Sequence, residues 1–274
     1  MSAEEPLKEV EYPKLYSNLQ KRSIEVHELV NQFKDYDVLI LGEEHNDEKG
    51  HQEKLKLIKL LSGIYEIGIS MEMFERDNQI VLDEYLLGII SESQFISDVR
   101  VWQNYKKDYR PILEFAKENH IPVIASNAPL RYVRLISKSG MDFWKQLPDT
   151  SFINLPPISS ITAHRSIEYE DKVAAAMGEH SLNSNDETRK RNFLLAQHLR
   201  DASMSHFISE SHYRLNKKIV HINGRFHSDN GLGVTFRLKS SGLKVLTVSM
   251  FPEDEKNKLE DNSGDVIYLT GKRQ

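Results

Sequence analysis

The chain has 274 residues and contains no cysteine. This excludes disulfide bonds, thiolate zinc sites, iron–sulfur clusters, a cysteine nucleophile and a lipidated cysteine. Long hydrophobic runs are absent too, since the longest, Val38–Leu41 and Tyr85–Ile90, fall far short of the ~20 residues that span a bilayer. We therefore expect no transmembrane segment. The chain as written has neither a signal peptide nor a lipobox, which predicts a cytoplasmic location.

An excess of positive charge is also lacking. The 36 Lys and Arg residues against 41 Asp and Glu residues give a net charge of −5, and the one short basic run is Arg189–Arg191. Nucleic acid is therefore not an expected partner. The HExxH, GxGxxG, Walker and GxSxG motifs are missing. The sequence therefore gives no support for a zincin, a dinucleotide-binding protein, a P-loop protein or an esterase with a nucleophile elbow.

What is present is 39% hydrophobic content arranged as short apolar runs between amphipathic segments. Each apolar run is typical of a buried strand, and the segments between carry apolar residues at helical spacing. Parallel strands need such helical crossovers, so the pattern predicts an α/β fold with a mostly parallel central sheet flanked by helices and an inserted helical subdomain. The expected strands are Val38–Leu41, Ile67–Met71, Pro122–Ala125, Lys218–Ile222 and Lys244–Ser249.

Composition also suggests how the chain is divided. Residues 1–22 form a polar amino-terminal segment, and residues 253–274 a polar tail. Pro156-Pro157 interrupts both helices and strands, which predicts that a helical subdomain of residues 156–217 begins there. The α/β core then consists of residues 23–155 and 218–252.

Polar side chains come directly after four of the predicted strands. In open parallel sheets, ligands bind beyond the carboxyl ends of the strands, so these side chains are expected to share one edge. A set of carboxylates and imidazoles suits a divalent metal ion or acid–base chemistry. The predicted metal or polar centre consists of Glu43, His45, Glu72, Asn127 and His227, with Glu43 and His45 as the catalytic candidates.

The same residues lie in segments that resemble the ChaN-like haem-binding family, which is similar to the Tiki metalloproteases and the erythromycin esterases. The resemblance reaches from about Val38 to Leu238. Its segments are LGEEHND, SMEMFERDNQ, LDEYLLG, DYRPILEFAKENHIPVIASNAPLRYV, AQHLRDASM and INGRFHSDNGLG.

The resemblance implies an α/β core with a helical subdomain, haem binding in iron acquisition, and a homodimer that holds two stacked haem groups with tyrosine ligation. Glu43 and His45 of GEEH, Glu72 of MEMFER and His227 of NGRFH fall where the wider superfamily keeps its polar or metal-binding centre. Asn127 of SNAP falls beside them. Relatives are often membrane-anchored or exported, a property that this chain, without a lipidated cysteine, does not share as written.

Haem iron accepts tyrosine, histidine or methionine, and no short motif fixes the ligand here. Tyr169, Val173, Ala176 and His180 share one face of an alanine-rich helix, which a flat macrocycle could approach. Tyr169 is the first candidate for the haem ligand and His164 the second. Arg165 or Arg131 could pair with propionates. Alternatively, this helix is simply a good helix former and Tyr169 a core aromatic.

Three hypotheses remain open. The first is a non-enzymatic haem-binding protein of the ChaN-like type. The second is a metal-dependent hydrolase in which Glu43 or His45 activates water and Glu72 and His227 hold a divalent ion. The third is a polar network that serves the structure alone.

Overall fold

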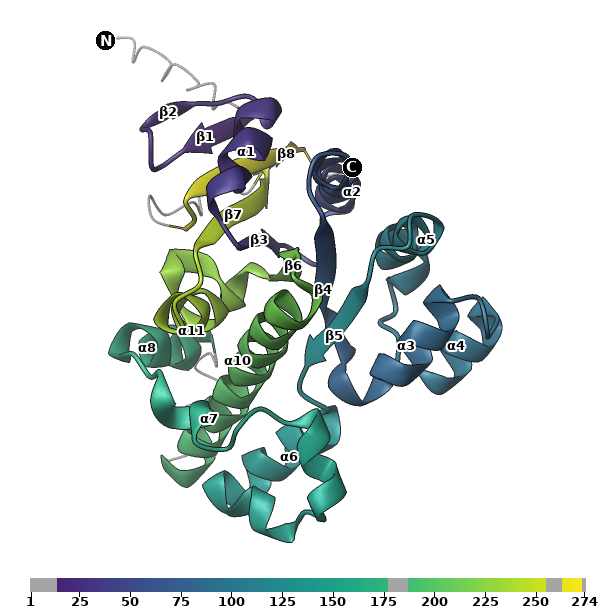
Figure 1. The fold of residues 1–274 in the computed structure, drawn as a ribbon. Helices are drawn as coiled ribbons and strands as arrows, with labels where there is room; N and C mark the ends of the chain where they lie inside the picture. Colours follow the sequence, from purple (N-terminus) through teal and green to yellow (C-terminus); the bar gives the residue numbers. More distant parts are fainter. Residues whose placement is uncertain (1–13, 177–186, 255–262, 273–274) are drawn as a thin grey trace, which may run out of the picture.

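The computed structural model describes residues 14–176, 187–254 and 263–272. An eight-stranded sheet forms its centre, in the order β2-β1-β8-β7-β3-β6-β4-β5 (Figure 1). The five pairs from β8 to β5 are parallel, whereas β1 pairs antiparallel with β2 and β8. The strands are β1 (Leu15–Ser17), β2 (Arg22–Ser23), β3 (Val38–Glu43), β4 (Ile67–Glu75), β5 (Val123–Asn127), β6 (Lys218–Gly224), β7 (Val245–Pro252) and β8 (Val266–Gly271). The mostly parallel α/β sheet predicted from the sequence is confirmed.

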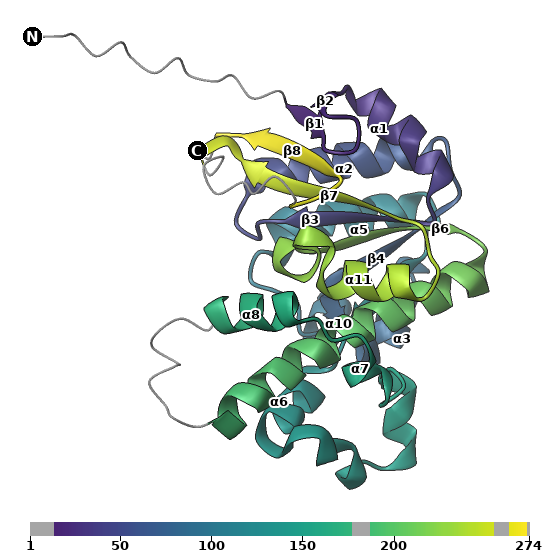
Figure 2. The ribbon, with the colours of Figure 1, turned by 90° about the vertical axis from the view of Figure 1, so that its left-hand side faces the viewer.

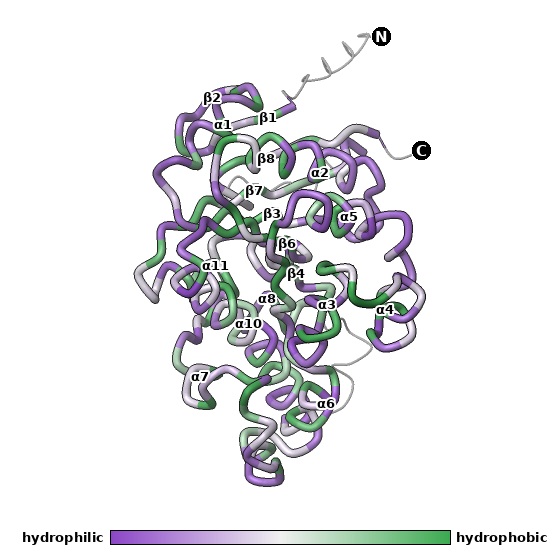
Figure 3. Tube along the Cα trace, turned by 45° about the vertical axis from the view of Figure 1, so that its right-hand side comes forward, coloured by the Kyte–Doolittle hydropathy of each residue, from purple (hydrophilic) through white to green (hydrophobic). Residues whose placement is uncertain are grey.

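Helices cover both faces of the sheet. Figure 2 shows α1, α2 and α5 on one side of the strands, and α10 and α11 on the other. The strands at the middle of the sheet, such as β3 and β4, are among the hydrophobic parts of the chain (Figure 3), as expected for strands buried on both faces. The helices are α1 (Val26–Gln32), α2 (Glu48–Ser62), α3 (Gln79–Leu86), α4 (Glu92–Asp98), α5 (Arg110–Glu118), α6 (Leu130–Ser139), α7 (Ser160–Ala163), α8 (Ile167–Ala176), α10 (Glu187–Leu215) and α11 (Gly233–Ser240). Within the described ranges, every helix is too short or too polar to cross a bilayer.

Local sequence explains where several helices begin and end. Ser91 caps α4 through a reciprocal pair of hydrogen bonds with Gln94. Pro111 lies in the first turn of α5, where its missing N–H leaves no helical bond unmade. Helix α6 ends at Gly140, whose φ of 64° is costly for any residue with a Cβ.

The expected polar tail after residue 252 is wrong in part. Residues Val266–Gly271 form β8, which pairs with β7 and β1 inside the sheet. The apolar run Val266–Leu269 is short and comes after a charged stretch, so its place depends on pairing with strands far away in the sequence. Likewise, residues 15–17 and 22 of the expected polar amino-terminal segment belong to β1 and β2.

The helices of the expected 156–217 subdomain do not stand apart from the sheet. Helix α10 packs against β4, β5 and β6 as well as against α6, α8 and α11. The hydrophobic cluster of the helical layer already begins at Ala128 and includes Tyr132, Phe143, Ile161 and Leu199. Long α10 therefore belongs to both layers and connects the helical layer to the carboxyl ends of the strands.

Candidate functional site

The ends of β3, β6 and β4 bring two of the predicted carboxylates to the same edge of the sheet. Glu43 is paired in register with Gly224, and Met71 with Ile222, so Glu72 lies directly beside the end of β6. Because side chains alternate along a strand, Glu43 projects toward α2 and Glu72 toward α10, on opposite faces of the sheet. The sequence predicted one cluster, and the structure has two that meet at the edge.

The first cluster surrounds the carboxylate of Glu43, which is 3% exposed. The hydroxyl of Tyr109 donates a hydrogen bond to Glu43 Oε1 over 2.6 Å, and the Nδ1 of His45 lies 2.9 Å from the same oxygen. The ammonium of Lys54 forms an ion pair with Glu43 Oε2. Tyr109 reaches this position because a single π-helical turn, Tyr105–Tyr109, precedes α5, and such turns are frequent at functional sites.

The hydrogen bonds fix the protonation of two histidines. Since the carboxylate of Glu43 can only accept, His45 carries its proton on Nδ1, and in the neutral ring Nε2 keeps a free lone pair. His51 Nε2 donates to the carbonyl oxygen of His45 over 3.1 Å, and His51 Nδ1 accepts from Lys54 over 2.9 Å. Burial lowers the pKa of His51, which favours this neutral form.

The second cluster surrounds Glu72, whose Oε2 accepts the backbone N–H of Gly224 over 2.7 Å. His227 lies between two carboxylates, with Nε2 3.5 Å from Glu72 Oε1 and Nδ1 2.6 Å from Asp201 Oδ1. Burial lowers the pKa of His227, but the charges of Glu72 and Asp201 outweigh burial and raise the pKa above its ordinary value. The structure thus favours a protonated imidazole held between two buried carboxylates.

Asn127 lies beside this cluster and positions its backbone. Its Nδ2 donates to the carbonyl oxygen of Glu72 over 3.0 Å, and its Oδ1 accepts from Arg200 over 3.3 Å. The amide therefore connects β5 to β4 and α10, and its hydrogen-bonding groups are committed to the protein itself.

Gly224 is the point where the two clusters meet. A Cβ at this position would lie 2.6 Å from His45 Nε2 and 3.6 Å from Glu72 Oε2, so these two atoms are no more than 6.2 Å apart. Only glycine permits this approach. His45 is also the open member of the site, with 44% of its side chain exposed and its ring against the edge of Trp102. Glu43, His45, Glu72 and His227 therefore lie at the same edge of the sheet, in two clusters that meet at Gly224.

Tyr169 lies beside the second cluster and not on an open surface. It is 3% exposed, and its ring packs against His198 and Phe226 at centroid distances of 5.5 Å and 6.2 Å. Burial raises the pKa of Tyr169, and the charge of Asp201, which the Tyr169 hydroxyl faces, raises it further. The helix face expected to meet haem is therefore turned inward at Tyr169 and Val173, whereas Ala174 and Ala175 are exposed. His180, expected on the same face, lies outside the described residues.

The other haem candidates are nearer to solvent. His164 is half-buried, with its ring 6.2 Å from that of Phe236. Arg165 forms an ion pair with Glu170, and Arg131 with Asp77. Each of these arginines thus already has a carboxylate partner.

Lys54 and Asp201 are two site residues that the sequence analysis missed. Both lie on helices, whereas the prediction considered only the residues directly after each strand. A signal existed, because Asp201 is a charged residue between the apolar residues Leu199 and Ala202 on the buried side of α10. Lys54 comes three residues after His51, so both face the same side of α2.

A divalent metal ion does not fit this arrangement. No group of three or more histidine, aspartate or glutamate side chains within residues 14–176, 187–254 and 263–272 is arranged to hold one. The ammonium of Lys54 already neutralises Glu43, and His227 occupies the space between Glu72 and Asp201. The metal centre expected from Glu43, His45, Glu72, Asn127 and His227 is thus a network of hydrogen bonds and ion pairs in the structure.

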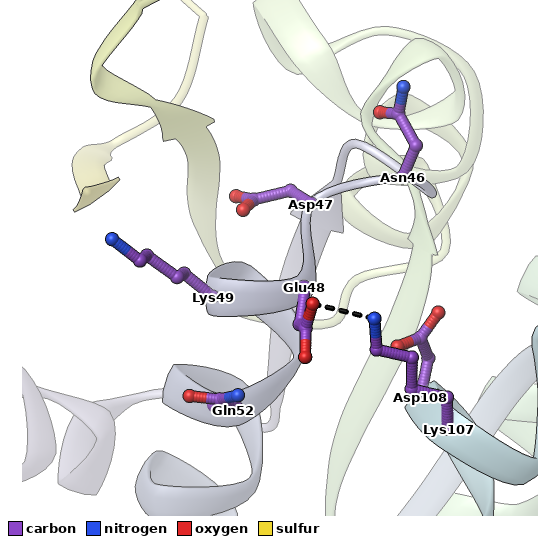
Figure 4. A pocket seen from close by; sticks show the side chains of 7 residues that line it. All are labelled: Asn46, Asp47, Glu48, Lys49, Gln52, Lys107 and Asp108. Atoms are coloured by element: carbon purple, nitrogen blue, oxygen red, sulfur yellow. Dashed lines mark ion pairs between the residues drawn. The ribbon is translucent and has the colours of Figure 1, made fainter. Parts of the chain in front are cut away.

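Hollows lie beside the first cluster and in the helical layer. One, of about 220 Å³, opens at the amino terminus of α2 between Asp47 and Asp108, where Lys107 pairs with Glu48 (Figure 4). Two more, of about 330 and 340 Å³, lie in the helical layer and share Arg165, Arg191 and Leu194. The first is lined by charged and amide side chains, whereas the other two combine apolar groups with both cationic and acidic side chains.

Comparisons with known proteins place this geometry in context. The family described as "Haem-binding uptake, Tiki superfamily, ChaN" matches residues 29–238. The sequence matches none of the proteins whose function is curated. Among solved structures, ChaN of Campylobacter jejuni, described with cofacial haem binding, is 14% identical, with 96% of this chain and 99% of that chain covered and a TM-score of 0.73.

Two further structures are less similar. A succinoglycan biosynthesis protein is 12% identical, with coverage of 83% and 69% and a TM-score of 0.50. An erythromycin esterase mutant in its open conformation is 10% identical, with coverage of 86% and 76% and a TM-score of 0.48, too low to support a shared mechanism. At these identities, likeness of structure shows a shared fold alone.

Proposed function

Because the chain belongs to the haem-binding uptake family of the Tiki superfamily that includes ChaN, we propose that it binds haem. The observation that carries the proposal is the family match over residues 29–238, supported by a fold shared with ChaN over nearly the full length of both chains. The resemblance seen in the sequence is confirmed by both findings. Haem binding itself, its site and its use in iron uptake are proposals.

We place the proposed haem site on the helical layer, where apolar and cationic side chains line two hollows. The two hollows beside α10 have volumes of about 330 and 340 Å³, at the lower end of the roughly 300–1,000 Å³ of small-molecule sites. Leu194 and Ala174 supply apolar contact for the macrocycle, and Arg191 supplies a guanidinium group for a propionate. Arg165 can bind the second propionate only by giving up its ion pair with Glu170. Exposed Ile167 extends the apolar part of this surface.

Tyr169 and His164 remain the proposed iron ligands. The hydroxyl of Tyr169 faces Asp201 and is enclosed, so iron can reach it only if α8 moves relative to α10. Its raised pKa also disfavours the phenolate until a ferric ion compensates for the lost proton. His164 is half-buried and needs no such movement.

Titration with hemin tests both levels of the proposal. The wild-type protein should give a saturable shift of the Soret band, and Tyr169→Phe or His164→Ala should alter the spectrum of the complex. Tyr213→Phe, at an exposed position on α10, is the matched control and should leave the spectrum unchanged. No saturable shift with the wild type refutes haem binding, whereas binding with unaltered spectra in both variants refutes only the ligand assignment.

A homodimer that encloses haem is part of the proposal. Ile167, Phe193, Ala174 and Ala175 are exposed beside the proposed surface, where a second copy would cover them. Size-exclusion chromatography with light scattering should show a dimer when hemin is added. A monomer at saturating hemin contradicts this part alone.

A hydrolase is the second candidate function, favoured by one observation. The Glu43–His45 pair leaves a lone pair on Nε2 of His45, whose side chain is 44% exposed and lies near Glu72, which is the arrangement of an imidazole base oriented by a carboxylate. Since a divalent ion does not fit, any such reaction would depend on acid–base chemistry. Cleavage of activated esters should then be lost in His45→Ala, and equal rates for both proteins exclude this function.

A further inference from the structure

His45 is the most exposed residue of the first cluster, yet both its ring and its backbone are held in place. The ring Nδ1 lies 2.9 Å from Glu43 Oε1, and the ring packs against Trp102 at a centroid distance of 4.9 Å. The backbone carbonyl oxygen accepts hydrogen bonds from His51 Nε2 and from Asn104 Nδ2, each over 3.1 Å. These contacts leave Nε2 as the ring nitrogen of His45 that is not committed to Glu43.

Two of these contacts depend on the same buried lysine. Lys54 is 0% exposed, and its ammonium group forms an ion pair with Glu43 Oε2. The same Nζ lies 2.9 Å from Nδ1 of His51, which is one turn earlier on α2. Lys54 therefore touches both the carboxylate that holds the ring of His45 and the imidazole that holds its carbonyl group.

The ammonium group of Lys54 determines where the proton of His51 lies. Because an ammonium group can only donate, Nδ1 of His51 must accept, and the single proton of the neutral ring lies on Nε2. Only this tautomer can donate to the carbonyl oxygen of His45. Asp108 Oδ2 lies 3.6 Å from the same Nε2, beyond hydrogen-bond distance, and favours this tautomer only through its charge.

A similar argument applies to the ring of His45. The ammonium group of Lys54 compensates the charge of the Glu43 carboxylate, whose oxygens then act as acceptors. Oε1 accepts the hydroxyl group of Tyr109 and takes the Nδ1–H of His45 as its second donor. The proton of the neutral His45 ring is thereby kept on Nδ1, away from Nε2.

A role in packing alone does not explain a lysine at this position. Burying an ammonium group costs several kcal/mol before its partners compensate, and apolar side chains of similar volume often replace a buried ion pair without loss of stability. An apolar side chain cannot donate hydrogen bonds to two different groups at once. The contacts of Lys54 with Glu43 and His51 thus indicate a role in arranging the site.

We propose that Lys54 is a positioning residue which selects the tautomers of His51 and His45 and so keeps Nε2 of His45 as the free basic nitrogen of the first cluster. The proposal deepens the hydrolase candidate, and its catalytic consequence rests on that function. The positions of the protons can be measured without it, and they do not depend on haem binding.

Nitrogen NMR of protein with isotope-labelled histidine measures the tautomers directly, because protonated and unprotonated ring nitrogens have well-separated chemical shifts. At about pH 8, where ordinary imidazoles are neutral, wild-type His45 should carry its proton on Nδ1 and His51 on Nε2. In Lys54→Met, both rings should lose this single pattern and show mixtures of tautomers. Lys56→Met, at an exposed position two residues further along α2, is the matched control and should keep the wild-type pattern.

The spectrum of wild-type protein can overturn the proposal by itself, if His51 carries its proton on Nδ1 or His45 on Nε2. The proposal is also overturned if folded Lys54→Met keeps the wild-type pattern. Should Lys54→Met fail to fold because Glu43 has lost its counter-ion, Lys54→Met/Glu43→Gln removes both charges. A single Nε2–H tautomer of His51 in that double variant would then overturn the proposal, and mixed tautomers would support it.

Cleavage of an activated ester separates this proposal from the hydrolase candidate. If wild-type protein cleaves the ester, kcat/KM of Lys54→Met should fall toward the value of His45→Ala, whereas Lys56→Met should match wild type. If wild type and His45→Ala are equally slow while the NMR pattern depends on Lys54, the hydrolase candidate is refuted and the positioning role is supported.

Discussion

The ion pairs of His227 with Glu72 and Asp201 allow the electrostatics of the site to be tested directly. His227 lies between Asp201 and Glu72, and all three side chains are buried. His227→Gln keeps the approximate size and a hydrogen-bond donor but removes the positive charge. Two carboxylates then remain buried without their shared counter-ion.

The cost can be worked out from the geometry. Breaking a buried ion pair by removing one partner costs about 3–5 kcal/mol, because the remaining charge is uncompensated. At roughly 2–4 °C per kcal/mol for chains of this size, the melting temperature should fall by about 6–20 °C. His27→Gln, at an exposed position in α1, should change stability by less than about 0.5 kcal/mol.

The raised pKa of His227 also predicts how the loss of stability in His227→Gln changes with pH. Because the folded-state pKa of His227 is raised above the ordinary 6.5, its charge contributes stability that is fully present below pH 6.5. This contribution is lost as the pH rises through the folded-state pKa. The difference in unfolding free energy between wild type and His227→Gln should therefore be larger at pH 6 than at pH 9.

Urea denaturation monitored by tryptophan fluorescence at the two pH values measures this difference. A gap that stays constant, or that grows at higher pH, would show that His227 is neutral in the folded protein. The assignment of a protonated imidazole between Glu72 and Asp201 would then be wrong.

Single substitutions elsewhere test three other features of the structure. Gly224→Ala places a Cβ 2.6 Å from the Nε2 of His45, so the imidazole ring must move and its hydrogen bond to Glu43 should lengthen. Nitrogen NMR of the imidazole detects this change, and an unchanged spectrum contradicts the close approach. Leu199→Ala in buried α10 should cost about 2–5 kcal/mol in urea denaturation, and a loss below about 1 kcal/mol would contradict its place in the core. Arg237→Met removes donors to two carbonyl groups of α7, so hydrogen exchange there should accelerate; unaltered exchange would show that these bonds do not hold α7.

Much of the fold could be predicted because each central strand is a separate apolar run. The predicted starts of β3, β4 and β6 agree with the structure, and Glu187–Leu215 is helical over its whole predicted length. The strands end later than predicted, since β4 continues through Glu72 to Glu75 and β6 continues to Gly224. Hydrophobicity alone gives no signal for a strand that continues into a polar site.

The site could be predicted only where strand ends supply it. The positions of Glu43, Glu72 and His227 result from parallel strands, but their separation onto two faces depends on the pleat at each strand end. Lys54 and Asp201 come from helices whose rotation about their axes is set by packing on the sheet. The inward position of Tyr169 likewise depends on how α8 packs beside His198 and Phe226.

Haem binding is the claim on which the functional proposal depends, and one hemin titration of wild-type protein measures it directly. We expect the Soret band to shift and to saturate near one haem per chain. A spectrum that remains that of free hemin across the titration would contradict haem binding, whatever the fold and the family indicate.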